Sequence, residues 1–405
     1  MSETKAANLE GVRIEAPGFE EELAQRHGRL REDLEELGAE VLIATREASV
    51  TYLTGYTTRT WSNFSRPIVA LLFADGSLEM LCADTEAQQI EARVPNVVVS
   101  GYGGLRAVEP GTPLPDGRFQ FSPGAVEALD KLLRERGVSR IAVDGLGALH
   151  PPVSQLTDGL GDWPRELIDA STALWDRRLI KSDWEVDQLI RAARVLEVAF
   201  DLLPARLAPG LSERELHGLL GAACFEAGAD EIGYTDVVVV GGGREIFGSP
   251  TDRVWNRGEV LYVDGGVIVN GYWADFCRQY TVGEPTAAQA DAFAVVAEER
   301  ERALSEFRVG MAAGELGALM GETAGIDPGS HQAGRFGHGI GLYMPEPPSL
   351  APVDTTPLEP GIAFCLEPML FRDGTHYVIE EEYVVGGEGL RPITEPAPQE
   401  LIGIS

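Results

Sequence analysis

Residues 260–278 read Val260-Leu-Tyr-Val-Asp264-Gly-Gly-Val-Ile-Val-Asn270-Gly271-Tyr-Trp-Ala-Asp275-Phe-Cys-Arg278 and predict a β-hairpin. Asn-Gly between two apolar runs is the strongest short-range hairpin signal and indicates a two-residue type I′ turn. A turn centred on Asn270-Gly271 places Asp275 opposite Gly266 and Cys277 opposite Asp264. Because side chains alternate between the faces of a strand, both aspartates lie on one face, roughly 7–8 Å apart at the backbone. The hairpin therefore predicts two carboxylates within reach of one ion.

A second hairpin follows, with Asp373-Gly374 as its turn. This centre sets Glu367 directly opposite Glu380, and like charges directly opposite destabilise a sheet. A bound cation removes that penalty, so the register itself favours a metal site. It selects Glu380 over Glu381, which points to the other face. Glu382 shares the face of Glu380 but has no acidic partner at this register.

The alternative is that these acidic residues lie on a solvated face of ordinary hairpins. The strands around them are rich in Val, Ile, Leu and Tyr, and the run before Asp264 is apolar. Buried carboxylates need partners, so the composition favours a metal site over a solvated face.

The motifs around these residues resemble the pita-bread metallopeptidases of family M24, which include methionine aminopeptidase, prolidase, aminopeptidase P and the non-peptidase creatinase. The residues that carry the resemblance are Asp264, Asp275, Gly337-His338-Gly-Ile-Gly-Leu342, Leu366-Glu367-Pro368 and Ile379-Glu380-Glu381. The resemblance begins near Leu179 and runs to the end of the chain. Through Val50-Thr-Tyr-Leu-Thr-Gly55, the first half resembles the creatinase/prolidase amino-terminal domain more loosely.

The resemblance implies an α/β (α+β) protein with two domains. Residues 1–170 would form a creatinase/prolidase-like mixed-sheet domain, and residues 176–405 a pita-bread catalytic domain. Its pseudo-twofold halves would be helix-plus-hairpin units around a shared sheet. An internal match supports the duplication, since Gly210-Leu-Ser-Glu-Arg-Glu-Leu resembles Gly310-Met-Ala-Ala-Gly-Glu-Leu.

The resemblance also implies two divalent metal ions, with ligands Asp264, Asp275, His338, Glu367 and Glu380. Asp275 and Glu380 would bridge the ions, His338 and Glu367 would complete one site, and Asp264 would bind the other ion with both oxygens. Glu367 and His338 are the implied catalytic residues, with Glu367 accepting a proton from the attacking water. Carboxylates with one imidazole suit Mn²⁺, Co²⁺, Fe²⁺ or Zn²⁺, so the metal stays open.

The chain departs from the family at the two helper histidines of its peptidases. Phe247 lies near the first expected position and Pro345 occupies the second, and no histidine occurs between His217 and His331. The usual Asp-x-Thr-Arg reads Asp275-Phe-Cys277-Arg278. These departures weaken the prediction of an Xaa-Pro peptidase without affecting the predicted metal centre.

Six residues are predicted to contact substrate, and three of them, like two nearby cysteines, also have a structural interpretation. His376 reaches the rim of the site or is a surface residue beside a turn. Trp61 and Arg66 either line the edge of a partner subunit's pocket or belong to an ordinary loop. Cys277 and Cys365 line the pocket or act as small buried apolar residues. The six predicted contacts are Phe247, Pro345, Arg278, His376, Trp61 and Arg66.

Composition limits the partners and the compartment. The 405 residues suffice for two domains, and four cysteines without recognisable spacing predict no disulfide framework. The net charge of -31 disfavours nucleic acids and anionic membranes as partners. No targeting segment or membrane-spanning run is recognisable, so we expect a cytoplasmic protein, and the family implies a homodimer.

Local patterns predict several elements. They are a helix over Phe19–Leu37 ending at Gly38, strands at Ala39–Ala44, Pro67–Phe73, Ser77–Ala83 and Arg140–Val143, a helix over Val126–Arg136, a domain boundary within Pro151–Ser171, and a helix capped by Ser182 and Glu185.

The leading functional prediction is a dinuclear-metal hydrolase of a C–N (amide) bond, by default an Xaa-Pro dipeptidase or aminopeptidase P. The alternatives are a small-molecule hydrolase resembling ectoine hydrolase or creatinase, and a metal-dependent lyase. A non-catalytic binding protein ranks last, because members that lost catalysis also lost ligands, and all five are present here.

Overall fold

The computed structural model describes residues 17–58, 67–103, 123–144, 166–240, 248–320 and 334–404. Two compact units divide the chain between Arg178 and Leu179. Among the described helices, none is long and apolar enough to cross a membrane.

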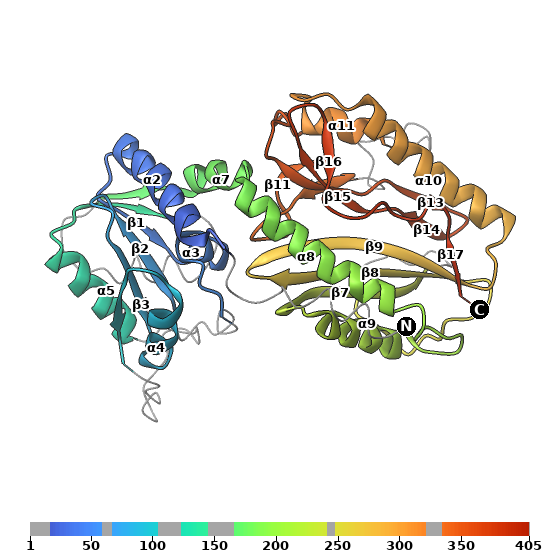
Figure 1. The fold of residues 1–405 in the computed structure, drawn as a ribbon, viewed down its shortest axis with the longest axis horizontal. Helices are drawn as coiled ribbons and strands as arrows, with labels where there is room; N and C mark the ends of the chain where they lie inside the picture. The colour runs from blue at the N-terminus through green and yellow to red at the C-terminus, as the bar shows by residue number, and fades with distance from the viewer. Residues whose placement is uncertain are drawn as a thin grey trace, which may run out of the picture. The chain divides into compact units, whose positions relative to one another are not determined.

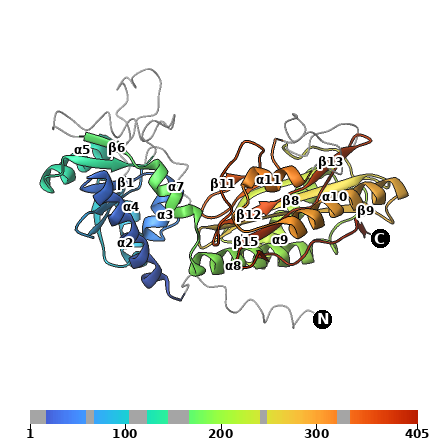
Figure 2. The ribbon, with the colours of Figure 1, turned by 90° about the horizontal axis from the view of Figure 1, so that it is seen from above.

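The first unit, which begins at Glu15, is built on a mixed six-stranded sheet (Figure 1). Its strand order is β4-β3-β2-β1-β5-β6, with β1–β2 and β2–β3 antiparallel and the other pairs parallel. The elements are α2 (Phe19–Leu37), β1 (Val41–Ala44), α3 (Glu47–Thr54), β2 (Val69–Phe73), β3 (Leu78–Cys82), α4 (Asp84–Arg93), β4 (Val97–Gly101), α5 (Pro123–Glu135), β5 (Arg140–Val143), β6 (Glu166–Asp169) and α7 (Ser171–Leu179). Helix α5 covers one face of this sheet, and α2 and α3 lie on the other (Figure 2).

These elements agree with the sequence patterns. Helix α2 ends at Gly38 with a φ of 62°, a left-handed conformation that glycine adopts without strain. The boundary predicted within Pro151–Ser171 falls partly outside the described residues, and its last part contains β6, which pairs with β5. Part of the predicted boundary segment is therefore a strand of the first sheet and not a linker between domains.

The second unit contains the predicted hairpins between two pairs of helices (Figure 1). Its elements are α8 (Asp183–Leu202), α9 (Glu213–Ala227), β7 (Glu231–Val240), β8 (Val260–Val269), β9 (Tyr272–Val282), α10 (Ala287–Glu306), α11 (Ala313–Leu319), β10 (Gly337–Gly339), β11 (Glu346–Ser349), β12 (Ala363–Leu366), β13 (Met369–Arg372), β14 (Thr375–Val378), β15 (Glu381–Val385), β16 (Leu390–Pro392) and β17 (Ile402–Ile404). Helices α8 and α9 contact β7–β9, whereas α10 contacts β13 and β14 and α11 contacts β11.

The first hairpin has the predicted register. Asp264 pairs with Cys277 and Gly266 with Asp275. The turn residues Asn270 and Gly271 both have positive φ, at 52° and 82°, as a type I′ turn requires.

The second hairpin keeps its register but is interrupted. Leu366 pairs with Glu381 in a five-stranded sheet, while Met369 pairs with Val378 in a separate two-stranded sheet. Pro368 lies at the break, where it has no amide hydrogen to give to a ladder. Glu367 and Glu380 occupy this break, so the predicted continuous strands are wrong there although the two residues still face each other in register.

The internal repeat appears as two matching pairs of backbone hydrogen bonds. The Gly210 amide donates to the Trp255 carbonyl and the Trp255 amide to Leu211, at 2.8 and 2.9 Å. One hundred residues on, the Gly310 amide donates to Leu358 and the Leu358 amide to Met311, at 2.9 and 2.8 Å. The halves do not share one ladder, however, because β17-β9-β8-β7 and β11-β10-β12-β15-β16 are separate sheets.

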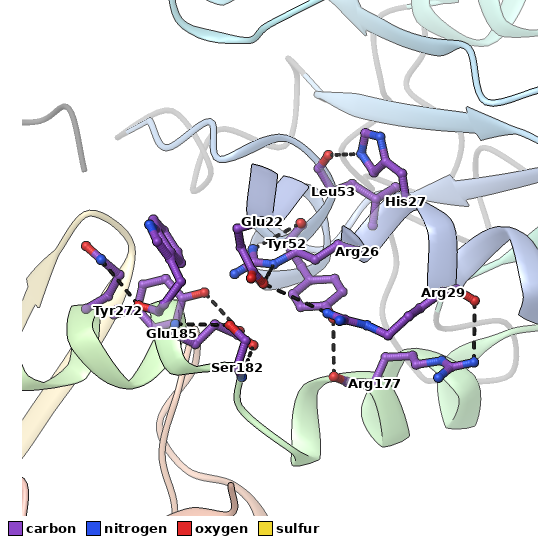
Figure 3. A network of polar contacts seen from close by, with 12 residues as sticks. Glu22, Arg26, His27, Arg29, Tyr52, Leu53, Arg177, Ser182, Glu185 and Tyr272 are labelled. Atoms are coloured by element: carbon purple, nitrogen blue, oxygen red, sulfur yellow. Dashed lines mark hydrogen bonds and ion pairs between the residues drawn. The ribbon is translucent and has the colours of Figure 1, made fainter. Parts of the chain in front are cut away.

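Side chains at the start of α8 hold the tip of the first hairpin (Figure 3). Ser182 and Glu185 form the predicted capping box, and the Tyr272 hydroxyl donates to Glu185 Oε1 at 2.9 Å. The Asn270 side chain donates to Gln188 Oε1 at 3.2 Å. The hairpin that carries Asp264 and Asp275 is thus anchored at its turn as well as along its ladder.

Figure 3 also shows a buried network within the first unit. Arg26 Nε donates to Glu22 Oε1 at 2.7 Å, and the guanidinium lies 4.5 Å from the centre of the Tyr52 ring. The Tyr52 hydroxyl donates to the Arg177 carbonyl at 3.2 Å, tying α3 to α7.

A substitution at Gly339 tests how closely the backbones of β10 and β11 approach each other. A Cβ at Gly339 would overlap the Pro347 carbonyl and lie 2.6 Å from the Glu346 carbonyl oxygen. We expect Gly339→Ala to lower the free energy of unfolding by about 1–3 kcal/mol, measured as a lower Tm for the second unit. The control is Gly218→Ala in α9, where a Cβ meets nothing within 4 Å, and it should raise Tm slightly. Equal effects of the two substitutions would contradict this packing.

Candidate metal centre

The five predicted ligands come from both halves of the second unit. Asp264 lies on β8, Asp275 on β9 and His338 on β10, while Glu367 and Glu380 flank the break in the second hairpin. Asp264, Asp275, His338 and Glu380 are buried, and the Glu367 side chain is 14% exposed. The fold therefore gathers residues that are up to 116 positions apart, from Asp264 to Glu380, into one interior site.

The tightest group of potential ligand atoms comes from Asp275, His338, Cys365 and Glu380, one atom from each, all within 4.8 Å of one another. His338 Nε2 lies 3.4 Å from Asp275 Oδ2 and 4.0 Å from Glu380 Oε1. Asp264 and Glu367 lie outside this group but interact electrostatically with Glu380. The prediction missed one member, Cys365, as a potential ligand.

The tautomer of His338 can be assigned from its neighbours. Nδ1 lies 3.1 Å from the Gly339 carbonyl oxygen, which can only accept, so Nδ1 carries the hydrogen. Burial lowers the pKa of His338 to about 4, which keeps the ring neutral. Nε2 then presents its lone pair to two carboxylates, an arrangement that a cation between them would stabilise.

The carboxyl groups hold their protons more tightly than usual. Burial raises the pKa of Asp264 to about 7, partly offset by the hydrogen bond from Tyr262. Burial raises the pKa of Glu367 to about 7, partly offset by Arg335. For Asp275 and Glu380, burial and repulsion from neighbouring carboxylates raise the pKa well above the ordinary range.

Positive charge is scarce around these groups. In the part of the chain that the structure describes, Arg335 is the only lysine or arginine that forms an ion pair with one of the four carboxylates, and its Nε lies 3.7 Å from Glu367 Oε1. A divalent cation would supply the missing charge, and the donor set of carboxylates with one neutral imidazole suits such an ion.

Two phenols orient the aspartates. The Tyr262 hydroxyl donates to Asp264 Oδ2 at 2.9 Å, and the Tyr234 hydroxyl donates to Asp275 Oδ1. Asp264 Oδ1 is buried and has no hydrogen-bond partner. An unsatisfied buried carboxylate oxygen is unfavourable, so this atom also fits a metal ligand. Because side chains alternate along a strand, the sequence could have identified Tyr262, which lies two residues before Asp264. Tyr234 could not be identified in this way, because its position opposite β8 depends on the register of β7, which contains a bulge.

Glu382 has a role that the sequence did not reveal. It is buried, and its Oε1 accepts a hydrogen bond of 2.5 Å from the Asp275 amide. This bond joins β15 to β9 across the two separate sheets. Glu381 faces the opposite way, as predicted, and pairs with Arg300 Nη1 at 3.2 Å.

Three of the six predicted substrate contacts, Arg278, His376 and Pro345, lie in the described residues. Arg278 donates to the Cys277 carbonyl at 2.7 Å and to the Glu380 carbonyl at 3.4 Å, and it lies 4.5 Å from the centre of the Phe276 ring. The His376 ring lies 4.6 Å from that of Phe371, beside the turn, and Pro345 is exposed before β11. The remaining three predicted contacts, Phe247, Trp61 and Arg66, lie outside the described residues.

Comparison with known proteins gives a consistent picture. Metallopeptidase family M24 matches residues 187–387, and the creatinase/prolidase N-terminal domain matches residues 26–180. A probable dipeptidase PepE of Mycobacterium tuberculosis is 28% identical over 272 residues, covering 65% of this chain and 70% of that protein.

Solved structures also match along most of the chain. The X-Pro aminopeptidase of Thermotoga maritima superimposes with a TM-score of 0.78 at 21% identity, covering 93% of this chain and 99% of that one. An Xaa-Pro dipeptidase from Bacillus anthracis gives 0.76 at 25% identity, covering 94% and 99%. These matches confirm the predicted fold, a creatinase-like first domain followed by a pita-bread domain.

Substitution of the central carboxylates should remove metal. We expect Asp275→Asn and Glu380→Gln each to lose bound metal at one or both positions, because each takes away a carboxylate next to His338. Elemental analysis of the purified, Mn²⁺-supplemented variants measures this. The control is Glu381→Gln, whose side chain faces Arg300 and should leave the metal content unchanged. Full metal content in either test variant would contradict the ligand assignment.

The stability of the metal-free protein should fall as pH rises. Asp264 and Glu367 have pKa values of about 7, against ordinary values of 3.8 and 4.5, so the folded protein binds their protons more tightly than the unfolded chain. Their contribution to stability is full below the ordinary values and is lost as pH rises through about 7. Chelated protein should show a Tm that decreases over this range, and Glu367→Gln should weaken the decrease. A Tm that is constant or rises would count against the buried carboxylate cluster.

Proposed function

Since the chain belongs to metallopeptidase family M24, a family of hydrolases, we propose that it cleaves the C–N bond of a dipeptide or small amide with two divalent cations at the centre around His338. The observation that supports this most directly is the neutral imidazole of His338, whose Nε2 faces two buried carboxylates. By default the substrate is an Xaa-Pro dipeptide, as the names of the similar Thermotoga and Bacillus proteins suggest.

We propose Asp264, Asp275, His338, Glu367 and Glu380 as the residues that hold the cations. The unpartnered Oδ1 of Asp264 and the lone pair of His338 support this set. When bound, divalent cations lower the pKa of a bound water and polarise a substrate carbonyl. Mn²⁺, Co²⁺, Fe²⁺ and Zn²⁺ all suit these donors.

Glu367 is the proposed general base. A carboxylate within reach of the attacking water can accept its proton and later return it. Its partial exposure makes it reachable from solvent, unlike the fully buried Asp275. In the proposed reaction Glu367 takes a proton from the attacking water as the C–O bond forms. It then gives that proton to the leaving nitrogen as the C–N bond breaks.

Hydrogen bonds to His338 and from the two tyrosines orient the donor atoms of the centre. The Gly339 carbonyl fixes the hydrogen on Nδ1 of His338. Tyr234 and Tyr262 each engage one oxygen of an aspartate, which fixes the direction of the other oxygen. These contacts arrange the donor atoms before any substrate binds.

A second candidate is a hydrolase of small amides or guanidino compounds, or a lyase. The absence of histidine from position 345, where exposed Pro345 stands, favours it over a peptidase.

We further propose that the protein is a cytoplasmic homodimer with separate domains at residues 1–170 and 176–405. The compact units that divide at Arg178 and Leu179 support two domains. Light scattering of the purified chain tests the dimer, and expression of residues 176–405 alone tests the domain division.

The direct test is hydrolysis of Xaa-Pro dipeptides, with matched Xaa-Ala dipeptides, after loading with each of the four metals. We expect release of proline, and a kcat about 10²–10⁴-fold lower for Glu367→Gln. Arg335→Gln is the comparison variant, because it removes the ion-pair partner of Glu367 but no predicted ligand. Turnover of small amides alone would favour the second candidate. A metal-loaded protein that cleaves neither class would contradict the hydrolase proposal.

A further inference from the structure

We propose that Cys365 binds one of the cations through its sulfur, and that this thiolate makes the site prefer thiophilic metals such as Zn²⁺ or Co²⁺ over Mn²⁺. The inference rests on the proposed function, since it concerns the same cations. It adds a ligand of a different chemical kind to the carboxylates and the imidazole.

The strand pairing directs Cys365 into the site. Cys365 lies directly across from His338 in the β10–β12 ladder and across from Glu382 in the β12–β15 ladder. Side chains directly opposite each other in antiparallel strands lie on the same face, with Cβ atoms about 4.5–5.5 Å apart. Cys365 is therefore flanked on both sides by residues of the carboxylate cluster.

The contacts of the thiol support this direction. Cys365 Sγ lies 3.7 Å from the carbonyl oxygen of Asp275, and the sulfur belongs to the group whose ligand atoms all lie within 4.8 Å. Its chain neighbours Phe364 and Leu366 pack into a hydrophobic cluster on the other face of β12. The thiol thus faces polar groups while the flanking side chains fill the core.

Cys277 provides an internal comparison. All four cysteines are buried and free, and Cys277 also lies near the aspartates. Its Sγ is 3.9 Å from the Val378 carbonyl, and it packs in a hydrophobic cluster with Val260, Tyr262 and Val378. Cys277 packs in this apolar cluster and is not in the group of ligand atoms that contains Cys365.

Two further features of the same centre indicate a cation. Asp264 Oδ1 is buried without a hydrogen-bond partner, and His338 Nε2 has its lone pair directed toward carboxylates. A thiol that coordinates a divalent ion gives up its proton to solvent and binds as a thiolate. Thiolate is a soft ligand and favours Zn²⁺ and related ions, whereas Mn²⁺ prefers oxygen ligands.

The test uses Co²⁺ as a spectroscopic probe in the full-length protein. We expect Co²⁺ binding to produce a thiolate-to-cobalt charge-transfer band in the near ultraviolet. Cys365→Ser should abolish this band, while Cys277→Ser and Cys224→Ser should keep it. In a competition between Zn²⁺ and Mn²⁺, Cys365→Ser should lower the preference for Zn²⁺ at least about tenfold, which corresponds to 1.4 kcal/mol.

A measurement on the unsubstituted protein makes the test independent of variant folding. X-ray absorption of the Zn²⁺-loaded chain should show a sulfur neighbour at about 2.3 Å. Bound Zn²⁺ or Co²⁺ without a sulfur neighbour or charge-transfer band would overturn the thiolate but leave the proposed function intact. A band lost in Cys277→Ser and kept in Cys365→Ser would overturn the assignment to Cys365. A chain that binds no metal would overturn both proposals.

Discussion

Repulsion among buried carboxylates is the constraint on which the second half of this protein depends. Asp264, Asp275, Glu380 and Glu382 are buried together, with Glu367 at the edge of the group. Burial and mutual repulsion make their ionised forms unfavourable, so the site needs protons or cations for its charge to be tolerated. The rigid strands on both sides prevent the groups from separating to relieve this repulsion.

One oxygen of each of three buried carboxylates accepts a hydrogen bond from within the protein. Asp264 gives one oxygen to Tyr262, Asp275 gives one to Tyr234, and Glu382 gives one to the Asp275 amide. In Asp264 and Glu382 the second oxygen is left without a hydrogen bond. For Asp264 that free oxygen belongs to a proposed ligand.

Local signals predicted most of the fold, and they failed where tertiary packing decides. The Asn270-Gly271 turn alone gave the register that pairs Asp264 with Cys277, because turn geometry determines register in a tight hairpin. The break at Glu367 escaped prediction, since a single proline was read as part of a continuous strand. Tyr234 and the partner of Glu382 depend on how separate strands meet, which no local sequence pattern encodes. The family resemblance gave His338 its role, and of the two helper positions the described structure includes Pro345, which is exposed before β11.

The matching pairs of backbone hydrogen bonds at Gly210 and Gly310 mark two halves of the second unit that are built alike. One half supplies Asp264 and Asp275, and the other supplies His338, Glu367 and Glu380. Any ion held by both sets therefore acts as a cross-link between them, and its binding free energy becomes docking free energy. Loss of the ion would weaken the attachment between the two halves, which the bond between Asp275 and Glu382 and a shared hydrophobic cluster also hold together, so the centre contributes to the architecture as well as to the chemistry.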